Sequence, residues 1–100
     1  MSSERQWGEV GTRLLFENHR VRIWELALEP GESSHWHTHK LDYVTVGLTE
    51  SRMRRQFEDG TSDETVGFAG RHTYADKHQP HEVTNIGSTF HKNILIEIKE

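Results

Sequence analysis

The chain contains no cysteine, which excludes disulfide bonds, thiolate metal sites and cysteine nucleophiles. No apolar run is longer than the three residues Ile-Leu-Ile at 94–96, so no segment could cross a bilayer as a helix. The net charge of −4 lacks the basic excess that binding to DNA or RNA requires. Residues 1–6 lack the apolar stretch of a signal peptide. We therefore expect a cytoplasmic protein that has no nucleic-acid partner and no membrane partner.

Helical patterning is also missing, because no stretch of about ten residues repeats apolar side chains every three to four positions. The chain has instead short runs of β-branched and aromatic residues separated by turn residues. Residues 21–28 form one such run, which stops at Pro30. In the final segment Ile94, Ile96 and Ile98 alternate, so they share one face of a strand. This spacing predicts an all-β fold of about six to ten short strands.

The length of the chain, 100 residues, suffices for one domain with a modest core. Hydrophobic residues make up only 32% of it, and even with the 8 glycines the apolar fraction stays low for a globular domain. We expect residues 13–100 to form a single all-β domain. Residues 1–12 are expected to form an N-terminal tail or a peripheral strand.

Eight histidines stand out in this composition, and six of them lie within residues 35–81. Side chains alternate faces along a strand, so His35, His37 and His39 are expected on one face. Two imidazoles two residues apart can both reach one metal ion, which needs at least one further ligand. His81 is the candidate for that ligand. From this spacing alone, a solvated histidine-rich face without affinity for metal is an equal alternative.

A wider pattern favours the metal site. Gly31 is followed by five residues and then by His37-Thr38-His39, and Gly70 is followed by five residues, Asp76-Lys77-His78, two residues, His81, three residues and Asn85. These patterns resemble the two motifs of the cupin superfamily of small β-barrels. The similarity covers most of the chain, from about residue 20 to residue 98.

The first motif departs from the cupin pattern at its acidic ligand. The usual glutamate is missing, and only two residues, rather than three or four, separate His39 from the nearby carboxylate, Asp42. An ungapped count places Tyr43 at the position of that ligand. A second register, with His35 and His37 as the pair, restores the spacing to the carboxylate but shortens the spacing from the preceding glycine. We favour His37 and His39, because the glycine spacing and the following Asp-Tyr-Val both agree with small cupins.

The resemblance implies a single-domain antiparallel jelly-roll β-barrel with a metal site inside it. It implies one divalent ion, Fe, Mn, Ni, Cu or Zn, bound by His37, His39 and His81, with Asp42 as a fourth ligand. Tyr43 and His35 are the expected residues of a substrate pocket. Among Arg52, Arg54 and Arg55, one side chain that reached the pocket could hold a carboxylate substrate.

For function, the resemblance implies a metal-dependent enzyme, dioxygenase-like or isomerase/lyase-like, that acts on a small polar metabolite. The alternative is a non-catalytic cupin that binds a small ligand or senses a metal. The small core and the 3 tryptophans also predict a homodimer. Similar small cupins pair through strands, and residues 5–30 are the expected contact segment.

Overall fold

The computed structural model describes residues 7–99, except for the side chains of residues 78 and 79. Within that range the chain forms nine β-strands and no helix. The strands are β1 (Arg13–Glu17), β2 (Val21–Leu28), β3 (His37–His39), β4 (Tyr43–Gly47), β5 (Ser51–Phe57), β6 (Ser62–Gly67), β7 (His72–Ala75), β8 (His78–Asn85) and β9 (His91–Ile98). The described residues thus contain no helix that could span a membrane.

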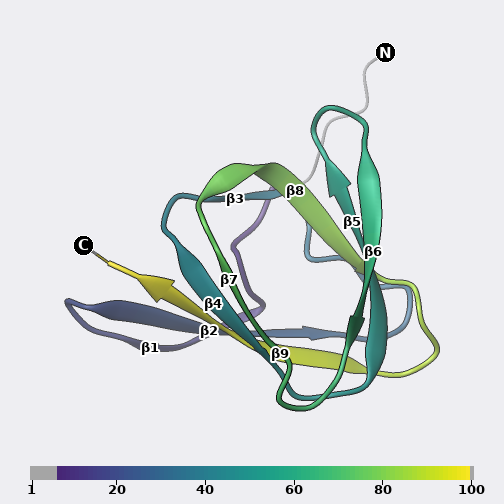
Figure 1. Ribbon diagram of the computed structural model, residues 1–100, viewed down its shortest axis with the longest axis horizontal. Coiled ribbons are helices and arrows are strands. Elements are labelled where there is room, and N and C mark those ends of the chain that lie inside the picture. Colours follow the sequence, from purple (N-terminus) through teal and green to yellow (C-terminus); the bar gives the residue numbers. More distant parts are fainter. Residues whose placement is uncertain (1–6, 100) are drawn as a thin grey trace.

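The strands form two sheets whose pairs are all antiparallel. One sheet has the order β1-β2-β9-β4-β7 and the other has the order β3-β8-β5-β6. The two sheets face each other and enclose the interior of the molecule between them (Figure 1). The prediction of an all-β, antiparallel jelly-roll fold is therefore confirmed.

The N-terminal segment can be followed only in part, since residues 1–6 of the expected tail lie outside the described residues. Trp7 forms an isolated parallel bridge with Trp36, and the Gly8 N–H donates to the Trp36 carbonyl at 2.8 Å. Val10 is buried, with 8% of its surface exposed. The chain before β1 thus packs against the barrel from residue 7 onwards.

Strand β9 shows which face of its sheet points inward. The isoleucines at 94, 96 and 98 share a face, as predicted, but that face is the outer, half-buried one. The buried face carries His91, Asn93, Leu95 and Glu97. The strand therefore turns mostly polar side chains toward the interior, which indicates that the interior is more than an apolar core.

The apolar core is small and divided into two clusters. Val10, Trp24, Tyr43 and Leu95 form one cluster, and Leu26, Leu28 and Met53 form the other. Among the described residues, these seven buried hydrophobic side chains are outnumbered by nine buried polar ones. The interior thus holds more buried polar side chains than hydrophobic ones.

Candidate metal centre

Three histidines from two paired strands meet at one end of the interior. Strand β3 supplies His37 and His39, strand β8 supplies His81, and each side chain is only 3% exposed. His37 and His81 are partners in the β3–β8 register. One ring nitrogen of each histidine lies within 4.8 Å of the others. The structure thus brings together the three histidines that the sequence spacing singled out.

The donor set suits a divalent transition metal. Neutral imidazole binds all of the ions considered above, and three nitrogen donors leave coordination positions open for water or substrate. His37 Nδ1 lies 3.1 Å from the main-chain carbonyl oxygen of His35, to which it can only donate. This hydrogen bond places the lone pair of the neutral ring on Nε2, as in most metal-binding histidines. The residues present therefore fit a metal ion.

His35 itself does not share the face of His37 and His39. Its φ of 66° lies in the left-handed region, its side chain is exposed, and β3 begins only two residues later. Side chains alternate faces only within a continuous strand, so the predicted alternation does not extend to this residue. The sequence predicted His35 in a substrate pocket, and it is not among the residues that line the cavity described below. Its contribution to the site is the carbonyl that orients His37.

Asp42 lies apart from the histidine cluster. Its Oδ1 accepts a hydrogen bond from the Lys77 N–H and its Oδ2 accepts one from the Tyr74 hydroxyl, both at 3.0 Å. The Lys77 N–H and then the Tyr74 hydroxyl hold the pKa of Asp42 below its usual value. Within residues 7–99, the group of side chains that could share an ion contains the three histidines and no carboxylate. The structure therefore does not bring Asp42 into position as a fourth ligand, because the turn after β3 directs its carboxylate to β7.

Tyr43 lies beside the cluster. Its ring stacks on the imidazole of His39, with centroids 3.8 Å apart and planes 18° apart. Burial raises the pKa of Tyr43 to about 12, so the hydroxyl stays protonated at neutral pH and can donate a hydrogen bond. Tyr43 also lines the interior cavity, which is the place that the sequence predicted for it.

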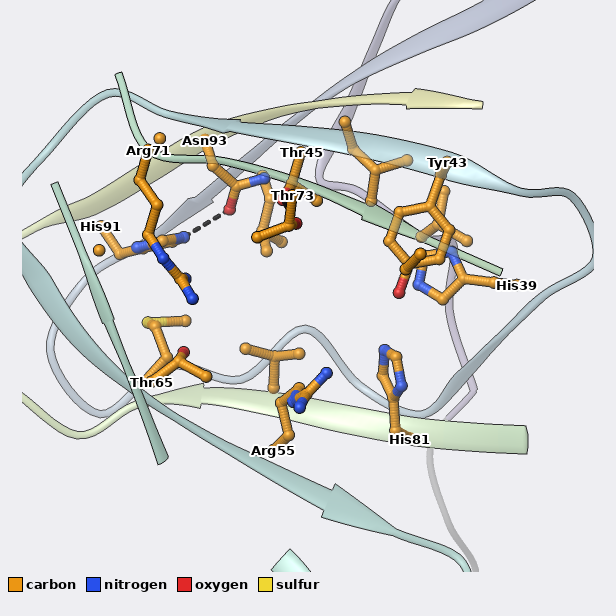
Figure 2. A pocket seen from close by; sticks show the side chains of 18 of the residues that line it. His39, Tyr43, Thr45, Arg55, Thr65, Arg71, Thr73, His81, His91 and Asn93 are labelled. Atoms are coloured by element: carbon orange, nitrogen blue, oxygen red, sulfur yellow. Dashed lines mark hydrogen bonds between the residues drawn. The ribbon is translucent and has the colours of Figure 1, made fainter. Parts of the chain in front are cut away.

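A cavity of about 270 Å³ runs between the two sheets from the histidine cluster to the far end of the barrel. Figure 2 shows His39, Tyr43 and His81 at one end and Arg71, His91 and Asn93 at the other. The volume lies near the lower limit of small-molecule sites, which begin at about 300 Å³. The described residues that line this cavity include no aspartate and no glutamate. The space therefore suits a small ligand that is neutral or negatively charged.

Sequence reasoning missed the polar residues at the far end. His91 Nε2 lies 2.5 Å from Asn93 Oδ1 and His91 Nδ1 lies 2.6 Å from Ser51 Oγ, so the imidazole is held on both sides. Burial lowers the pKa of His91. The sequence offers one faint signal for this pair, since His91 and Asn93 alternate with the isoleucines and share the face of Leu95. For Arg71 it offers none.

One arginine of β5 reaches the cavity, and it is Arg55. Its Nε and Nη2 donate to the two carboxylate oxygens of Asp63 at 2.9 and 2.6 Å, so most of its guanidinium is already bound. Arg52 and Arg54 are exposed and pair with Glu64. These three arginines of β5 thus mainly form ion pairs with Asp63 and Glu64.

Known structures resemble this fold. A cupin domain from Bordetella pertussis Tohama I has 29% sequence identity and a TM-score of 0.80, and the match covers 87% of this chain and 90% of that domain. A cupin superfamily protein from Desulfitobacterium hafniense DCB-2 has a TM-score of 0.64 at 17% identity, covering 87% of this chain and 74% of that one. A cupin family protein with a double-stranded β-helix fold from Methanocaldococcus jannaschii has a TM-score of 0.72 at 14% identity, covering 99% and 92%.

No family model matches the sequence, and no curated protein matches it. The fold and the solved structures nevertheless agree with the motif spacing around His37, His39 and His81. On these grounds the chain has the cupin fold, and it is similar to the cupin domain from Bordetella pertussis.

Proposed function

We propose that the protein binds one divalent metal ion through His37, His39 and His81 and acts as a metal-dependent enzyme on a small polar metabolite. The observation that carries the proposal is the position of the three buried histidines at one end of a cavity of about 270 Å³. A metal bound there would face the cavity, so a ligand in the cavity could reach its open coordination positions. The ion is one of Fe, Mn, Ni, Cu or Zn, since imidazole donors suit each of them.

The reaction class that fits best is the dioxygenase-like or isomerase/lyase-like chemistry of cupins with a similar donor set. When bound, the metal supplies a Lewis acid for a substrate oxygen or, if it is iron, a centre that activates O₂. The chain's own groups bind and orient the substrate. The Tyr43 hydroxyl can donate a hydrogen bond to a substrate oxygen, and the apolar side chains of Leu26, Met53 and Leu95 can pack against the carbon chain of the substrate.

Metal analysis of purified variants tests the metal site. His37→Ala, His39→Ala and His81→Ala should each lose most of the bound metal while keeping a β-sheet circular dichroism spectrum, because other residues build the core. His19→Ala is the matched control, since His19 is exposed in the turn between β1 and β2 and should leave the metal content unchanged. Full metal occupancy in His81→Ala would refute the proposed site.

Turnover distinguishes the enzyme from its alternative, a non-catalytic cupin that binds a small ligand or senses a metal. Iron-loaded protein should be screened aerobically for oxygen uptake against small diketones, thiols and catechols. Oxygen uptake that requires the three histidines supports the enzyme. Tight ligand binding without turnover of any of the three classes supports the alternative.

We further propose that the partner of the chain is a second copy of itself. Cross-strand partners share a face of their sheet, so the registers place nine apolar residues larger than alanine on the outer face of the five-stranded sheet. They are Phe16, Val21, Ile23, Val44, Val46, Tyr74, Ile94, Ile96 and Ile98. Phe16 and Tyr74 are exposed and the other seven are half-buried, and a contiguous apolar face of this kind is typical of a protein–protein contact.

The charges on this outer apolar face favour a second copy over an oppositely charged partner. Glu25 pairs with Lys92 at 3.0 Å and with Arg13 at 3.5 Å, so each of these charged side chains has an oppositely charged neighbour within the chain. Such a face does not repel an identical face, which an isologous dimer requires. The expected contact segment of residues 5–30 supplies three members of the face, and β4, β7 and β9 supply the others.

A further inference from the structure

Arg71 is a charged side chain of the cavity that has no role in the proposed metal site. It follows the Gly70 turn, immediately before β7, and lines the cavity at the end far from the histidines. Its guanidinium points into the cavity between His91 and Thr65 (Figure 2). Unlike Arg55, it makes no ion pair with any carboxylate among residues 7–99. A half-buried guanidinium of this kind is a binding group for an anion.

The backbone holds Arg71 firmly in this position. The Gly47 N–H donates to the Arg71 carbonyl at 2.7 Å, and the Arg71 N–H donates to the Phe68 carbonyl at 3.1 Å. A Cβ atom at Gly47 would lie 2.4 Å from the Phe68 carbonyl oxygen, so only glycine permits this close approach. The side chain therefore starts from a fixed point, which is what a specific ionic contact needs.

Asn93 supplies a second donor at the same end. His91 Nε2 lies 2.5 Å from Asn93 Oδ1, so the amide oxygen is engaged and the amide N–H groups are what Asn93 can offer to a ligand. Beside it, the hydroxyl groups of Thr45 and Thr73 hydrogen-bond to each other. A guanidinium and an amide N–H₂ together match the oxygens of a carboxylate.

The two ends of the cavity are separated by the length of strand β4. Tyr43 lies beside the histidines and Gly47 lies beside Arg71, and four residues of a strand span about 13 Å. The arginine side chain reaches back into this space, so one small molecule can touch both ends. The cavity volume of about 270 Å³ agrees with a small ligand that extends from Arg71 to the histidines.

We propose that the cavity binds a small dicarboxylic acid, with one carboxylate on Arg71 and Asn93 and the oxygens of the other end directed to His37, His39 and His81. The substrate class of the proposed enzyme is thus a short dianionic acid that carries a hydroxyl or keto oxygen beside the second carboxylate. The orientation toward the histidines rests on the proposed metal site. The contact between the first carboxylate and Arg71 does not depend on the metal site.

Matched ligands isolate the contact with Arg71. Malate and 2-hydroxybutanoate share the hydroxy-acid end and the length of their carbon chain, but only malate has a second carboxylate. The longer homologues 2-hydroxyglutarate and 2-hydroxyadipate, each with its monocarboxylate counterpart, extend the series. Isothermal titration calorimetry should measure the dissociation constants of each pair, and elemental analysis should give the metal content of the same samples. In the wild type we expect the dicarboxylate of the best-fitting length to bind at least about tenfold tighter than its counterpart.

Variants assign this preference to a residue. Arg71→Met should reduce the ratio of the two dissociation constants to about one, and Arg71→Lys should keep part of it, because lysine retains the charge but loses the planar fork. Arg52→Met is the control, since it removes the same charge from an exposed surface ion pair and should leave the ratio unchanged. His39→Ala should weaken both members of a pair to the same extent and leave their ratio unchanged.

The outcomes separate this proposal from that of the metal site. If the wild type takes up no metal, the proposed function fails, while the ratio measured on the metal-free protein still decides the role of Arg71. A wild-type ratio near one for every length, no binding of any of these acids, or a ratio that persists in Arg71→Met would each overturn the proposal.

Discussion

Replacement of Asn85 by alanine should remove a large part of the protein's stability. Asn85 is completely buried at the end of β8. Its Nδ2 donates to the carbonyl oxygens of Leu28 and Thr89 at 2.9 and 2.8 Å, and its Oδ1 accepts the N–H of Gly87 at 3.0 Å. One side chain therefore links the end of β2 to both ends of the turn between β8 and β9.

The expected loss follows from these three contacts. A buried polar group that loses its partner costs about 1–3 kcal/mol. The Leu28 carbonyl is fully buried, and the groups of Thr89 and Gly87 are partly buried, so water can compensate for some of their loss. The change should therefore lower the free energy of unfolding by about 3 kcal/mol, which for a domain of this size lowers the Tm by about 12–24 °C.

Thermal and urea unfolding of three variants would check this value. Asn85→Asp keeps the size of the side chain and the acceptor for Gly87 but sets a carboxylate against two carbonyl oxygens, so it should be destabilised at least as strongly as Asn85→Ala. Asn18→Ala is the matched control, because the exposed Asn18 Oδ1 accepts two main-chain N–H groups in the β1–β2 turn. Loss of these two exposed hydrogen bonds should cost only about 1 kcal/mol, because water can replace the lost acceptor. An Asn85→Ala protein as stable as Asn18→Ala, or an Asn85→Asp protein as stable as the wild type, would refute the reasoning.

Two further predictions concern pH and assembly. Burial keeps the pKa of His91 below its usual value, so the unfolded chain binds this proton more readily and the free energy of unfolding should fall as the pH drops below about 6.5. In urea titrations with a chelator present, the free energy of unfolding of His91→Gln should fall less with decreasing pH than that of the wild type. An equal fall in both proteins would show that His91 does not cause the pH dependence. Light scattering of the wild type should give twice the 11.7 kDa of one chain, whereas Ile96→Glu, at the centre of the outer apolar face, should give a monomer. A wild type that is monomeric in dilute solution would end the dimer proposal.

Strand patterns and turn residues are local, so the sequence sufficed to predict the all-β class, and the motif resemblance added the jelly-roll fold. Strand β2 covers the predicted residues 21–28 and buries Trp24, Leu26 and Leu28 at period two. Strand β9 was also predicted, but its isoleucines face outward. Period two shows that residues share a face, and hydrophobicity identifies the inner face only where the interior is an apolar core. Here the interior face carries polar residues that line a cavity, so hydrophobicity could not identify it.

The same limit separates the site residues that were predicted from those that were not. His37 and His39 share a face within one short strand, and motif spacing added His81, so sequence distance sufficed for all three. The direction of the His35 side chain depends on a left-handed φ, which no pattern in this sequence predicts. The position of the Asp42 carboxylate depends on the direction of a turn. The residues that it contacts, Tyr74 and Lys77, lie more than thirty positions away in the sequence. Side chains placed by tertiary contacts cannot be read from local spacing.

A protein with so few apolar side chains in its interior should gain much of its stability from what the interior binds. Only seven hydrophobic side chains are buried, and the three histidines pack against one another. A metal bound by them would link strands β3 and β8. A ligand at a free concentration one hundred times its Kd stabilises a protein by about 2.7 kcal/mol. For a domain of this length, that raises the Tm by about 10–20 °C.

The size of this metal-dependent rise can be tested with one variant and one control. Loss of one of three ligands should weaken binding by at least about 100-fold, since changes to groups that only support a ligand already cost about 10–100-fold. At the same metal concentration His81→Ala would then gain about 0.4 kcal/mol, which raises the Tm by only about 2–3 °C. Differential scanning calorimetry of the wild type, His81→Ala and His19→Ala, each with and without metal, measures the difference directly, and His19→Ala should keep the full rise. A rise in His81→Ala equal to that of the wild type, or no rise in the wild type with Fe, Mn, Ni, Cu or Zn, would show that the histidine cluster does not hold the ion.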